Sequence, residues 1–257
     1  MSILSIYCSG FNLENGLFDW QESLDRFYAF GDELCIGTTN DCKDKTIELL
    51  QNYISDKPRA KLVITDFLCN GRLSDGQIKN AALQATTLPA KVMLDLDEVP
   101  VLSQKQLWID YYNQMVAAGA ECLMIPSINL CGDIYHYKDI AHKFYLHMAG
   151  LNRGVVNYAK KENEIVDIKL SDGTEILNKD GNLPKIVTLS NDINMLKQYD
   201  VPYVFHKWGI DLNKRIGQNK FRKPIWEEMA GRQVDDVILD KKDIENIEVF
   251  EHGLLME

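Results

Sequence analysis

The sequence contains no apolar run that approaches the length of a membrane span, and its first residues lack a basic stretch followed by an apolar one. A membrane helix needs about 20 predominantly apolar residues. A secretory leader carries both of the segments that are missing at the start. We therefore expect no membrane span and a cytoplasmic location.

The sequence also lacks any Cys-x-x-Cys pair, although it contains six cysteines. Cysteines at that spacing are the usual ligands of structural zinc, so a zinc cluster is not expected. Four of the six lie in or beside apolar segments, which is typical of buried free thiols in a reducing compartment. These four are Cys8, Cys35, Cys69 and Cys122.

Positive charge is scarce as well. The chain has 28 Lys and Arg against 38 Asp and Glu, which gives a formal net charge of −10. Binding to nucleic acid over a whole surface needs clustered basic residues, so the composition argues against it and leaves only a local basic patch open. With 257 residues, 46% of them hydrophobic, the chain is long enough to bury a sizeable core.

Short apolar segments alternate with amphipathic ones through the first half of the chain. This alternation predicts right-handed crossovers and an α/β fold with a mostly parallel sheet flanked by helices. Ligands of such sheets bind beyond the carboxyl ends of the strands. The pattern places strands at 3–8, 34–36, 61–67, 92–94 and 122–126, and helices at 17–30, 46–53, 75–85 and 104–118.

The second half of the chain has a different pattern. Residues 153–186 alternate in polarity and contain the turn pairs Asp172-Gly173 and Asp180-Gly181, which predicts antiparallel hairpins. We expect a helix at 193–199, a strand at 203–205 and mostly helix at 212–229. The stretch around His136, His142 and His147 looks helical, and the acidic tail, 231–257, is expected to pack loosely.

The most informative segment is the acidic one that follows the apolar run ending at Leu94. It reads Asp95-Leu96-Asp97-Glu98. Residues i and i+2 of a strand share a face, so Asp95 and Asp97 are expected to converge on one hard cation that prefers oxygen ligands. An exposed turn is the alternative for any Asp-x-Asp.

The order of the motifs resembles that of the GT-A glycosyltransferases, specifically the family 2-like group. The resemblance spans about residues 3–100 and resumes near 203–223. It rests on a strand and turn at the start, an acidic second strand, a loop into a helix, a basic residue before the fourth strand, the acidic motif and a late histidine. These are residues 3–12, Asp32-Glu33, residues 42–46, Lys79-Asn80, Asp95 to Glu98, and His206 with Lys207, Lys214 and Arg215.

The chain departs from the family pattern at three positions. Cys42 stands where the family has the serine of a Ser-x-Asp-x-Thr loop, Thr39 stands where an acid usually ends the second strand, and Lys79 replaces an arginine. These changes concern the base and the ribose. They leave the candidate metal ligands unchanged.

The resemblance implies a GT-A (Rossmann-like) fold and a metal-dependent glycosyltransferase. Such an enzyme moves a sugar from a nucleotide donor, expected to be UDP-linked, onto a hydroxyl of a saccharide acceptor. Residues 1–130 would bind the nucleotide sugar, 131–230 the acceptor, and 231–257 would form the tail.

The resemblance also assigns roles to individual residues. Mn²⁺ or Mg²⁺ would be held by Asp95, Asp97 and His206, and an imidazole ligand suits Mn²⁺ better. The general base of an inverting reaction would be Asp172 or Glu175, whereas a retaining reaction would need neither. The expected donor-binding residues are Ser9, Asn12, Asp41, Asp44, Lys79, Asp95 and Lys207.

Several alternatives stay open. The basic, aromatic stretch 207–226 suggests a hydroxymethylated base in DNA as acceptor, as in phage DNA-modifying glycosyltransferases. A nucleotidyltransferase is less favoured because no Gly-rich loop follows the first strand, and a non-catalytic nucleotide-binding module is the remaining class. At single positions, Asp44 would serve only as a helix cap, Lys79 as a solvated charge and His206 as a core histidine.

Overall fold

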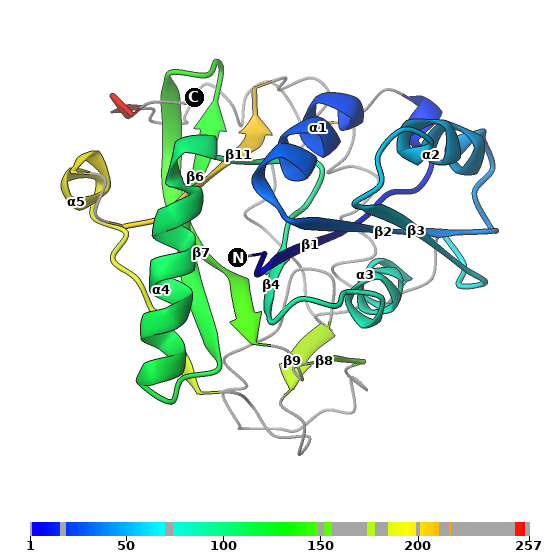
Figure 1. Cartoon of the computed structure of the whole chain (residues 1–257). Helices are drawn as coiled ribbons and strands as arrows, with labels where there is room; N and C mark the ends of the chain where they lie inside the picture. Colours follow the sequence, from blue (N-terminus) through cyan, green and yellow to red (C-terminus); the bar gives the residue numbers. More distant parts are fainter. Residues whose placement is uncertain are drawn as a thin grey trace, which may run out of the picture.

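The computed structural model describes residues 2–15, 19–69, 74–148, 152–155, 174–177, 185–198, 201–210, 216 and 250–254. Its centre is one sheet that contains both parallel and antiparallel strands. Helices lie on both sides of this sheet (Figure 1). The α/β class expected from the sequence is confirmed.

The first half of the sheet is parallel. Its strands are β1 (Leu4–Ser9), β2 (Glu33–Thr39), β3 (Ala60–Thr65) and β4 (Ala90–Met93). They are joined by α1 (Trp20–Phe30), α2 (Thr46–Ile54) and α3 (Ser74–Gln84). β1 pairs with β2 on one side and with β4 on the other, so the strand order reverses between β1 and β4. Open α/β sheets bind their ligands at the carboxyl ends of the strands at this kind of reversal.

The second half of the sheet is mixed. β7 (His136–Met148) runs antiparallel to both β4 and β6 (Cys122–Cys131), and β11 (Val204–Gly209) runs parallel to β6. The short β5 (Glu98–Pro100) pairs antiparallel with β11 at the edge of the sheet. The strand order is therefore β3-β2-β1-β4-β7-β6-β11-β5. A turn, η2 (Leu102–Gln104), and α4 (Lys105–Ala117) connect β5 to β6.

Alternate side chains of the parallel strands pack on opposite faces of the sheet. Ile6 of β1 belongs to the large core that includes the buried stripe of α1, while its neighbour Tyr7 packs with Ala82 and Leu83 of α3. Every residue of β1 and β2 is buried, as expected for a parallel sheet covered on both faces. The two faces therefore have separate apolar contacts.

Glycine at position 37 allows α3 to approach β2 closely. A Cβ built there would lie 2.5 Å from the carbonyl oxygen of Ile78. Any larger residue would push α3 away from the sheet. This contact fixes the distance between β2 and the helix that carries Lys79.

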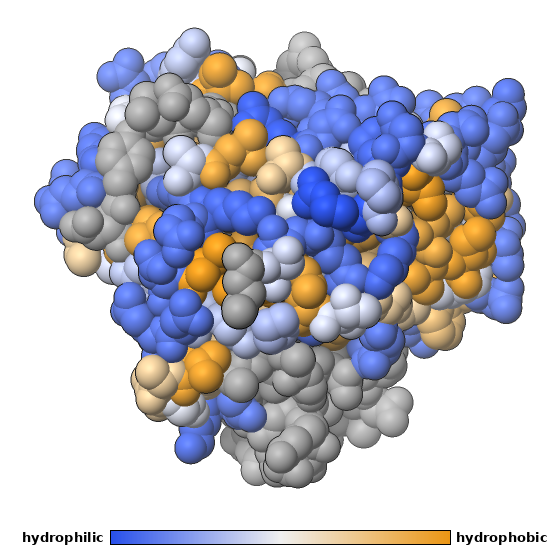
Figure 2. Space-filling view, in the orientation of Figure 1, coloured by the Kyte–Doolittle hydropathy of each residue, from blue (hydrophilic) through white to orange (hydrophobic). Residues whose placement is uncertain are grey.

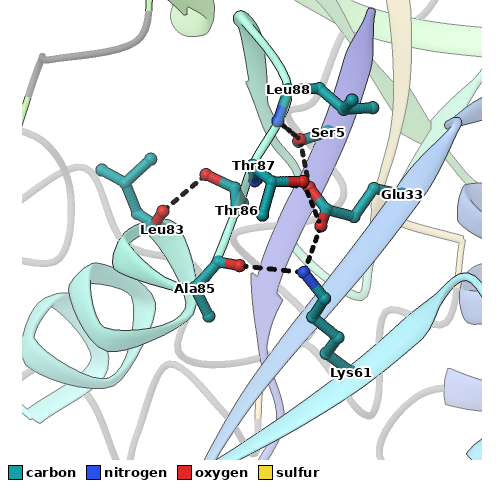
Figure 3. A network of polar contacts seen from close by, with 8 residues as sticks. All are labelled: Ser5, Glu33, Lys61, Leu83, Ala85, Thr86, Thr87 and Leu88. Atoms are coloured by element: carbon teal, nitrogen blue, oxygen red, sulfur yellow. Dashed lines mark hydrogen bonds and ion pairs between the residues drawn. The ribbon is translucent and has the colours of Figure 1, made fainter. Parts of the chain in front are cut away.

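A buried carboxylate ties the beginnings of the first strands together (Figure 3). Glu33 accepts hydrogen bonds from Ser5 of β1 at 2.5 Å, from Lys61 of β3 at 2.5 Å and from the Thr87 amide at 2.7 Å. Thr87 lies between α3 and β4. The contact therefore links all four parallel strands at the end opposite to their carboxyl termini.

The helix expected around His136, His142 and His147 is wrong. These residues belong to the long strand β7, which pairs with β6 from Cys122 to Leu130. Gly132, with φ of +83°, allows the tight return between the two strands. The pairing of two distant segments outweighs a weak local periodicity.

The expectation of a loosely packed tail is wrong for the last residues that the structure describes. β12 (Phe250–Glu251) pairs antiparallel with β7, and His252 is 2% exposed. The imidazole of His252 packs against Phe205 with ring centroids 5.1 Å apart. These contacts with β7 and β11 hold the segment against the sheet.

Other expectations are confirmed with small shifts in their bounds. α5 (Ile193–Lys197) takes the place of the helix expected at 193–199. β8 (Asn152–Val155) and β9 (Thr174–Leu177) form the only antiparallel pair described in the 153–186 region, and β10 (Ile186–Thr188) joins β6 in parallel. The helix expected at 212–229 falls outside the described residues, except for residue 216.

No helix in the described part of the chain is long and apolar enough to cross a membrane. Figure 2 shows mostly hydrophilic side chains around the rim, with apolar surface on the side where Figure 1 places β2 and β3. β3 is the outermost strand of the sheet there, and its Ile64 is exposed.

Candidate functional site

The acidic motif lies beside the reversal of strand order, directly after β4. Residues 94–97 are not part of a strand. The Glu98 amide donates to the Asp95 carbonyl oxygen at 2.8 Å, and the Asp95 amide donates to the Glu98 carboxylate at 2.8 Å. The segment is therefore a tight turn between β4 and β5, and the two aspartates do not share a strand face as the sequence suggested.

The side chain of Asp95 forms an ion pair with Lys79 of α3. The same ammonium lies 2.8 Å from the carboxylate of Asp75, whose other oxygen accepts a hydrogen bond from Ser9 at the end of β1. The Lys79 side chain is only 4% exposed. Lys79 was expected to contact the donor diphosphate; in this structure its ammonium connects two carboxylates from α3 and the acidic turn.

The side chain of Asp97 points to a different partner. It is 8% exposed, and its Oδ2 atom lies 3.2 Å from Nε2 of His206 on β11. The carbonyl oxygen of Asp97 accepts a hydrogen bond of 2.7 Å from the Lys207 amide. The acidic turn and β11 are thus joined at two of the three residues that the sequence named as metal ligands.

His206 continues into a row of polar side chains across the sheet. Its Nδ1 atom lies 2.7 Å from Oδ1 of Asn129 on β6, and Nδ2 of Asn129 donates to Asp139 on β7. Neither Asn129 nor Asp139 was expected from the sequence. Their positions follow from the pairing of β6 with β7, and the segment that forms β7 was expected to be helical.

Lys207 also reaches across to the first helix. Its ammonium lies 2.6 Å from the carboxylate of Glu22 on α1. The hydrogen bond from Lys207 lowers the pKa of Glu22 below its usual value, although partial burial acts in the opposite direction. The sequence named Lys207 but gave no sign of Glu22 as its partner.

The loops after β1 and β2 contact each other beside the same end of the sheet. Asp44 accepts from the amides of Thr46 at 3.0 Å and Glu14 at 2.9 Å, and Thr46 Oγ1 accepts from the Leu13 amide at 2.7 Å. Asp44 therefore binds the amide of the first residue of α2, although the N-cap position itself is Lys45 and has no side-chain cap bond, and it also anchors η1 (Leu13–Asn15).

Two further candidates shape these loops. Asn12 has a left-handed φ of 53°, and its side-chain oxygen accepts from the Lys43 amide at 3.1 Å. Asp41 accepts from the Cys69 amide at 2.9 Å and pairs with the Lys43 ammonium at 2.5 Å. The loops after β1, β2 and β3 are thus held together by side chains that the sequence singled out.

The candidates for the general base are largely outside the described residues. Asp172 is one of those outside. Glu175 lies in β9, where its backbone pairs with Gly154. Lys214 and Arg215 also fall outside the described part of the chain.

In the residues that the structure describes, no group of three or more His, Cys, Asp and Glu side chains is placed to hold a metal. Asp97 and His206 form a pair, while Asp95 is directed to Lys79. A cation at this site would therefore have two protein ligands, and other oxygens would complete its coordination.

No family model matches the sequence, and no curated protein matches it. Among solved structures, the chain is similar to the 1–349 fragment of S. aureus TarS at 12% identity and a TM-score of 0.42, covering 91% of this chain and 67% of that one. The fragment in complex with UDP-GlcNAc has 16% identity, a TM-score of 0.42 and coverages of 91% and 68%. A nucleoside-diphosphate-sugar pyrophosphorylase from Vibrio cholerae has 10% identity, a TM-score of 0.36 and coverages of 79% and 91%.

Proposed function

We propose that this protein is a metal-dependent glycosyltransferase that uses a nucleotide-sugar donor. The observation that carries the proposal is the contact of Asp97 with His206 at the reversal of strand order. It brings together an aspartate of the acidic motif and a late histidine, two features on which the resemblance to GT-A glycosyltransferases rests. More than 100 residues separate them in the sequence.

The spacing of the two side chains fits a divalent cation. Two ligand atoms bound at right angles to one ion, each about 2.1 Å from it, are roughly 3 Å apart. Asp97 Oδ2 and His206 Nε2 are 3.2 Å apart. One carboxylate and one imidazole suit Mn²⁺ and leave coordination positions for water and for phosphate oxygens.

The chemistry of such an ion is to offset the negative charge that develops on a diphosphate leaving group. Asp97 and His206 would hold it, with Lys207 fixing the backbone of Asp97. Asp95, whose side chain pairs with Lys79 and whose amide binds Glu98, would contact a ribose hydroxyl. The loops containing Ser9, Asn12, Asp41 and Asp44 would frame the nucleoside.

The acceptor must lose a proton as the new glycosidic bond forms. In an inverting reaction a carboxylate within hydrogen-bond reach takes that proton, and Asp172 and Glu175 are the candidates that we retain. We propose UDP as the carrier of the sugar and a saccharide hydroxyl as the acceptor. The basic stretch that motivates a DNA acceptor lies mostly outside the described residues, and its Lys207 is paired with Glu22.

Ligand-induced stabilisation tests the donor and the metal together. With UDP at 100 times its dissociation constant in the presence of Mn²⁺, we expect a gain of about 2.7 kcal/mol in the free energy of unfolding. That gain corresponds to a melting temperature raised by several degrees. UDP without Mn²⁺ should produce a much smaller shift.

The variant Asp97→Ala should lose the Mn²⁺-dependent part of this shift and the turnover of a UDP-sugar, because one of the two ligands is removed. Asp133→Asn is a matched control, since Asp133 lies on the β6–β7 turn and pairs with His136. Full transfer activity of the wild type in excess EDTA, or of Asp97→Ala, would refute the metal dependence. Absence of any stabilisation by nucleotides would refute the function.

A further inference from the structure

Three polar side chains stand side by side on neighbouring strands, and one of them, His206, belongs to the proposed metal pair. His206 of β11 is the cross-strand partner of Asn129 on β6, and Asn129 is the partner of Asp139 on β7. Side chains of directly paired residues lie on the same face of a sheet. The register of the sheet therefore produces a continuous row of Asp139, Asn129 and His206, and Asp97 of the acidic turn contacts the His206 end of this row.

The chemistry of this row determines where its hydrogens lie. The carboxylate of Asp139 can only accept hydrogen bonds, so Asn129 must present its NH₂ group to it. The carbonyl oxygen of Asn129 is then directed to Nδ1 of His206, at 2.7 Å. Because that oxygen can only accept, Nδ1 of His206 must carry a hydrogen.

The position of this hydrogen also determines the state of Nε2, the other ring nitrogen of His206. In a neutral ring with its hydrogen on Nδ1, the Nε2 atom has only a lone pair. This lone pair lies 3.2 Å from Oδ2 of Asp97, which is also an acceptor. Two acceptors at this distance repel each other unless a cation lies between them.

We propose that Asn129 and Asp139 are positioning residues that hold His206 in the tautomer with hydrogen on Nδ1, so that Nε2 and Asp97 together bind a divalent cation. The metal-ligating histidines of known sites are commonly oriented in this way by a partner on the other ring nitrogen. The second oxygen of Asp139 lies 3.6 Å from the Lys138 ammonium, which helps to orient the carboxylate. The proposal rests on the proposed function for the role of the metal, and it is tested separately.

The competing state is a His206 that is protonated on both nitrogens and forms a simple ion pair with Asp97. The hydrogen on Nε2 of this imidazolium would lie between Nε2 and Asp97, where the metal is proposed to bind. A His206 with its hydrogen on Nε2 would instead donate to Asp97 and would require the Asn129 amide to be reversed. Both states are distinguishable from the proposed one by the nitrogen chemical shifts of the ring.

The first experiment is NMR of the protein labelled with ¹⁵N-histidine and saturated with Mg²⁺, which is diamagnetic and supplies the cation that the proposed tautomer requires. The chain has five histidines, and the His206→Gln variant assigns the signals of His206. We expect hydrogen on Nδ1 and none on Nε2. An imidazolium, or a hydrogen on Nε2, overturns the proposal.

The second experiment measures Mn²⁺ affinity by electron paramagnetic resonance of the free ion, with no substrate present. Asp139→Asn removes the obligate acceptor, so the Asn129 amide can reverse and His206 can change its tautomer. We expect Mn²⁺ affinity to fall about tenfold or more, as is usual for partners of metal-ligating histidines. Asp139→Glu should keep most of the affinity, because it restores a carboxylate.

The controls separate positioning from a structural role. Asp139 is exposed to 49% of its side-chain area, so its replacement is expected to leave the fold intact, and the melting temperature checks this. Asp133→Asn, on the same hairpin but outside the row, should bind Mn²⁺ like the wild type. Lower affinity in Asp139→Asn with an unchanged tautomer would overturn the proposal.

The outcomes also separate this proposal from the proposed function. Mn²⁺ binding with the expected tautomer, but without transfer of any UDP-sugar, would refute the function alone. Metal-dependent transfer by a protein with His206 in the other tautomer would refute the positioning role alone. A wild-type protein that binds no Mn²⁺ would overturn both.

Discussion

Lys79 shows how strongly a single buried charge can constrain its surroundings. Its ammonium is 4% exposed and lies between the carboxylates of Asp75 and Asp95, which come from α3 and from the acidic turn. A buried cation is tolerated only when it is paired, and the two acids would repel each other without it. Lys79 therefore sets the orientation of Asp95 whatever ligand binds there.

Replacing Lys79 by Met should destabilise the protein by about 2–3 kcal/mol, because two partly buried carboxylates lose their common counter-charge. Urea denaturation at pH 7 measures the change. The matched control is the double variant Lys79→Met with Asp95→Asn, which should recover part of the loss, since it removes one of the two unpaired charges. Equal stability of Lys79→Met and the wild type would show that the cluster contributes nothing to the fold.

The site residues illustrate what a sequence can and cannot indicate at this scale. Asp95, Asp97 and His206 were singled out from their types and order, and Asp97 does lie beside His206, but the contact of Asp95 with Lys79 was not expected. Lys79 was expected at a diphosphate and is found between Asp75 and Asp95. A side chain's partner depends on which elements pack together, and residue type alone carries no such information.

At the scale of elements, the beginnings of the four parallel strands are held by Glu33 (Figure 3). Burial alone would raise the pKa of Glu33, but hydrogen bonds from Lys61, Ser5 and Thr87 outweigh it and lower the pKa from 4.5 to about 2. A carboxylate whose pKa is lower in the folded state adds stability above its unfolded pKa. That stability is lost as the pH falls from about 5 towards 2.

The variant Glu33→Gln should therefore lose about 2–3 kcal/mol at pH 7, and the difference from the wild type should shrink as the pH falls from 5 to 2.5. Urea denaturation across this pH range measures both effects. Glu48→Gln on the exposed side of α2 is the control and should change stability by less than about 0.5 kcal/mol. A difference independent of pH would contradict an ionised, hydrogen-bonded Glu33.

The helices and strands of the first half were predictable because their signals are local. The apolar residues of α1 recur at helical spacing, and Trp20, Leu24 and Phe27 are the ones that the structure buries. β7 was not predictable in this way. Its conformation depends on pairing with β6 and β4, and a strand gains its hydrogen bonds only from such partners.

At the scale of the whole molecule, the last described residues pair with β7 and pack against β11. His252 donates from Nε2 to the Ile134 carbonyl oxygen at 2.7 Å and accepts from the Leu254 amide at 2.9 Å. Burial lowers the pKa of His252, which favours the neutral ring that these two bonds require. Its neighbour Phe205 directly precedes His206, so this end of the chain supports the strand that carries the proposed ligand.

Replacing His252 by Ala should reduce the free energy of unfolding by about 2–3 kcal/mol, because two buried hydrogen bonds and the contact with Phe205 are lost. The measurement is thermal and urea denaturation at pH 7.5. Glu251→Ala, at an exposed position of the same strand, should have little effect. If both variants behaved alike, the packing of this segment would not contribute to stability.

The sequence by itself determined the α/β class, the succession of strands and helices up to α4 except for β5, and the residue types suited to a cation and a diphosphate. These follow from periodicity and side-chain chemistry, which act over a few neighbouring residues. The tertiary structure decided that Asp95 faces Lys79, that Asp97 faces His206, and that Asn129 and Asp139 stand behind His206. Those contacts depend on strand order and register, because only the packed sheet brings side chains from β6, β7, β11 and the turn after β4 within hydrogen-bond distance of one another.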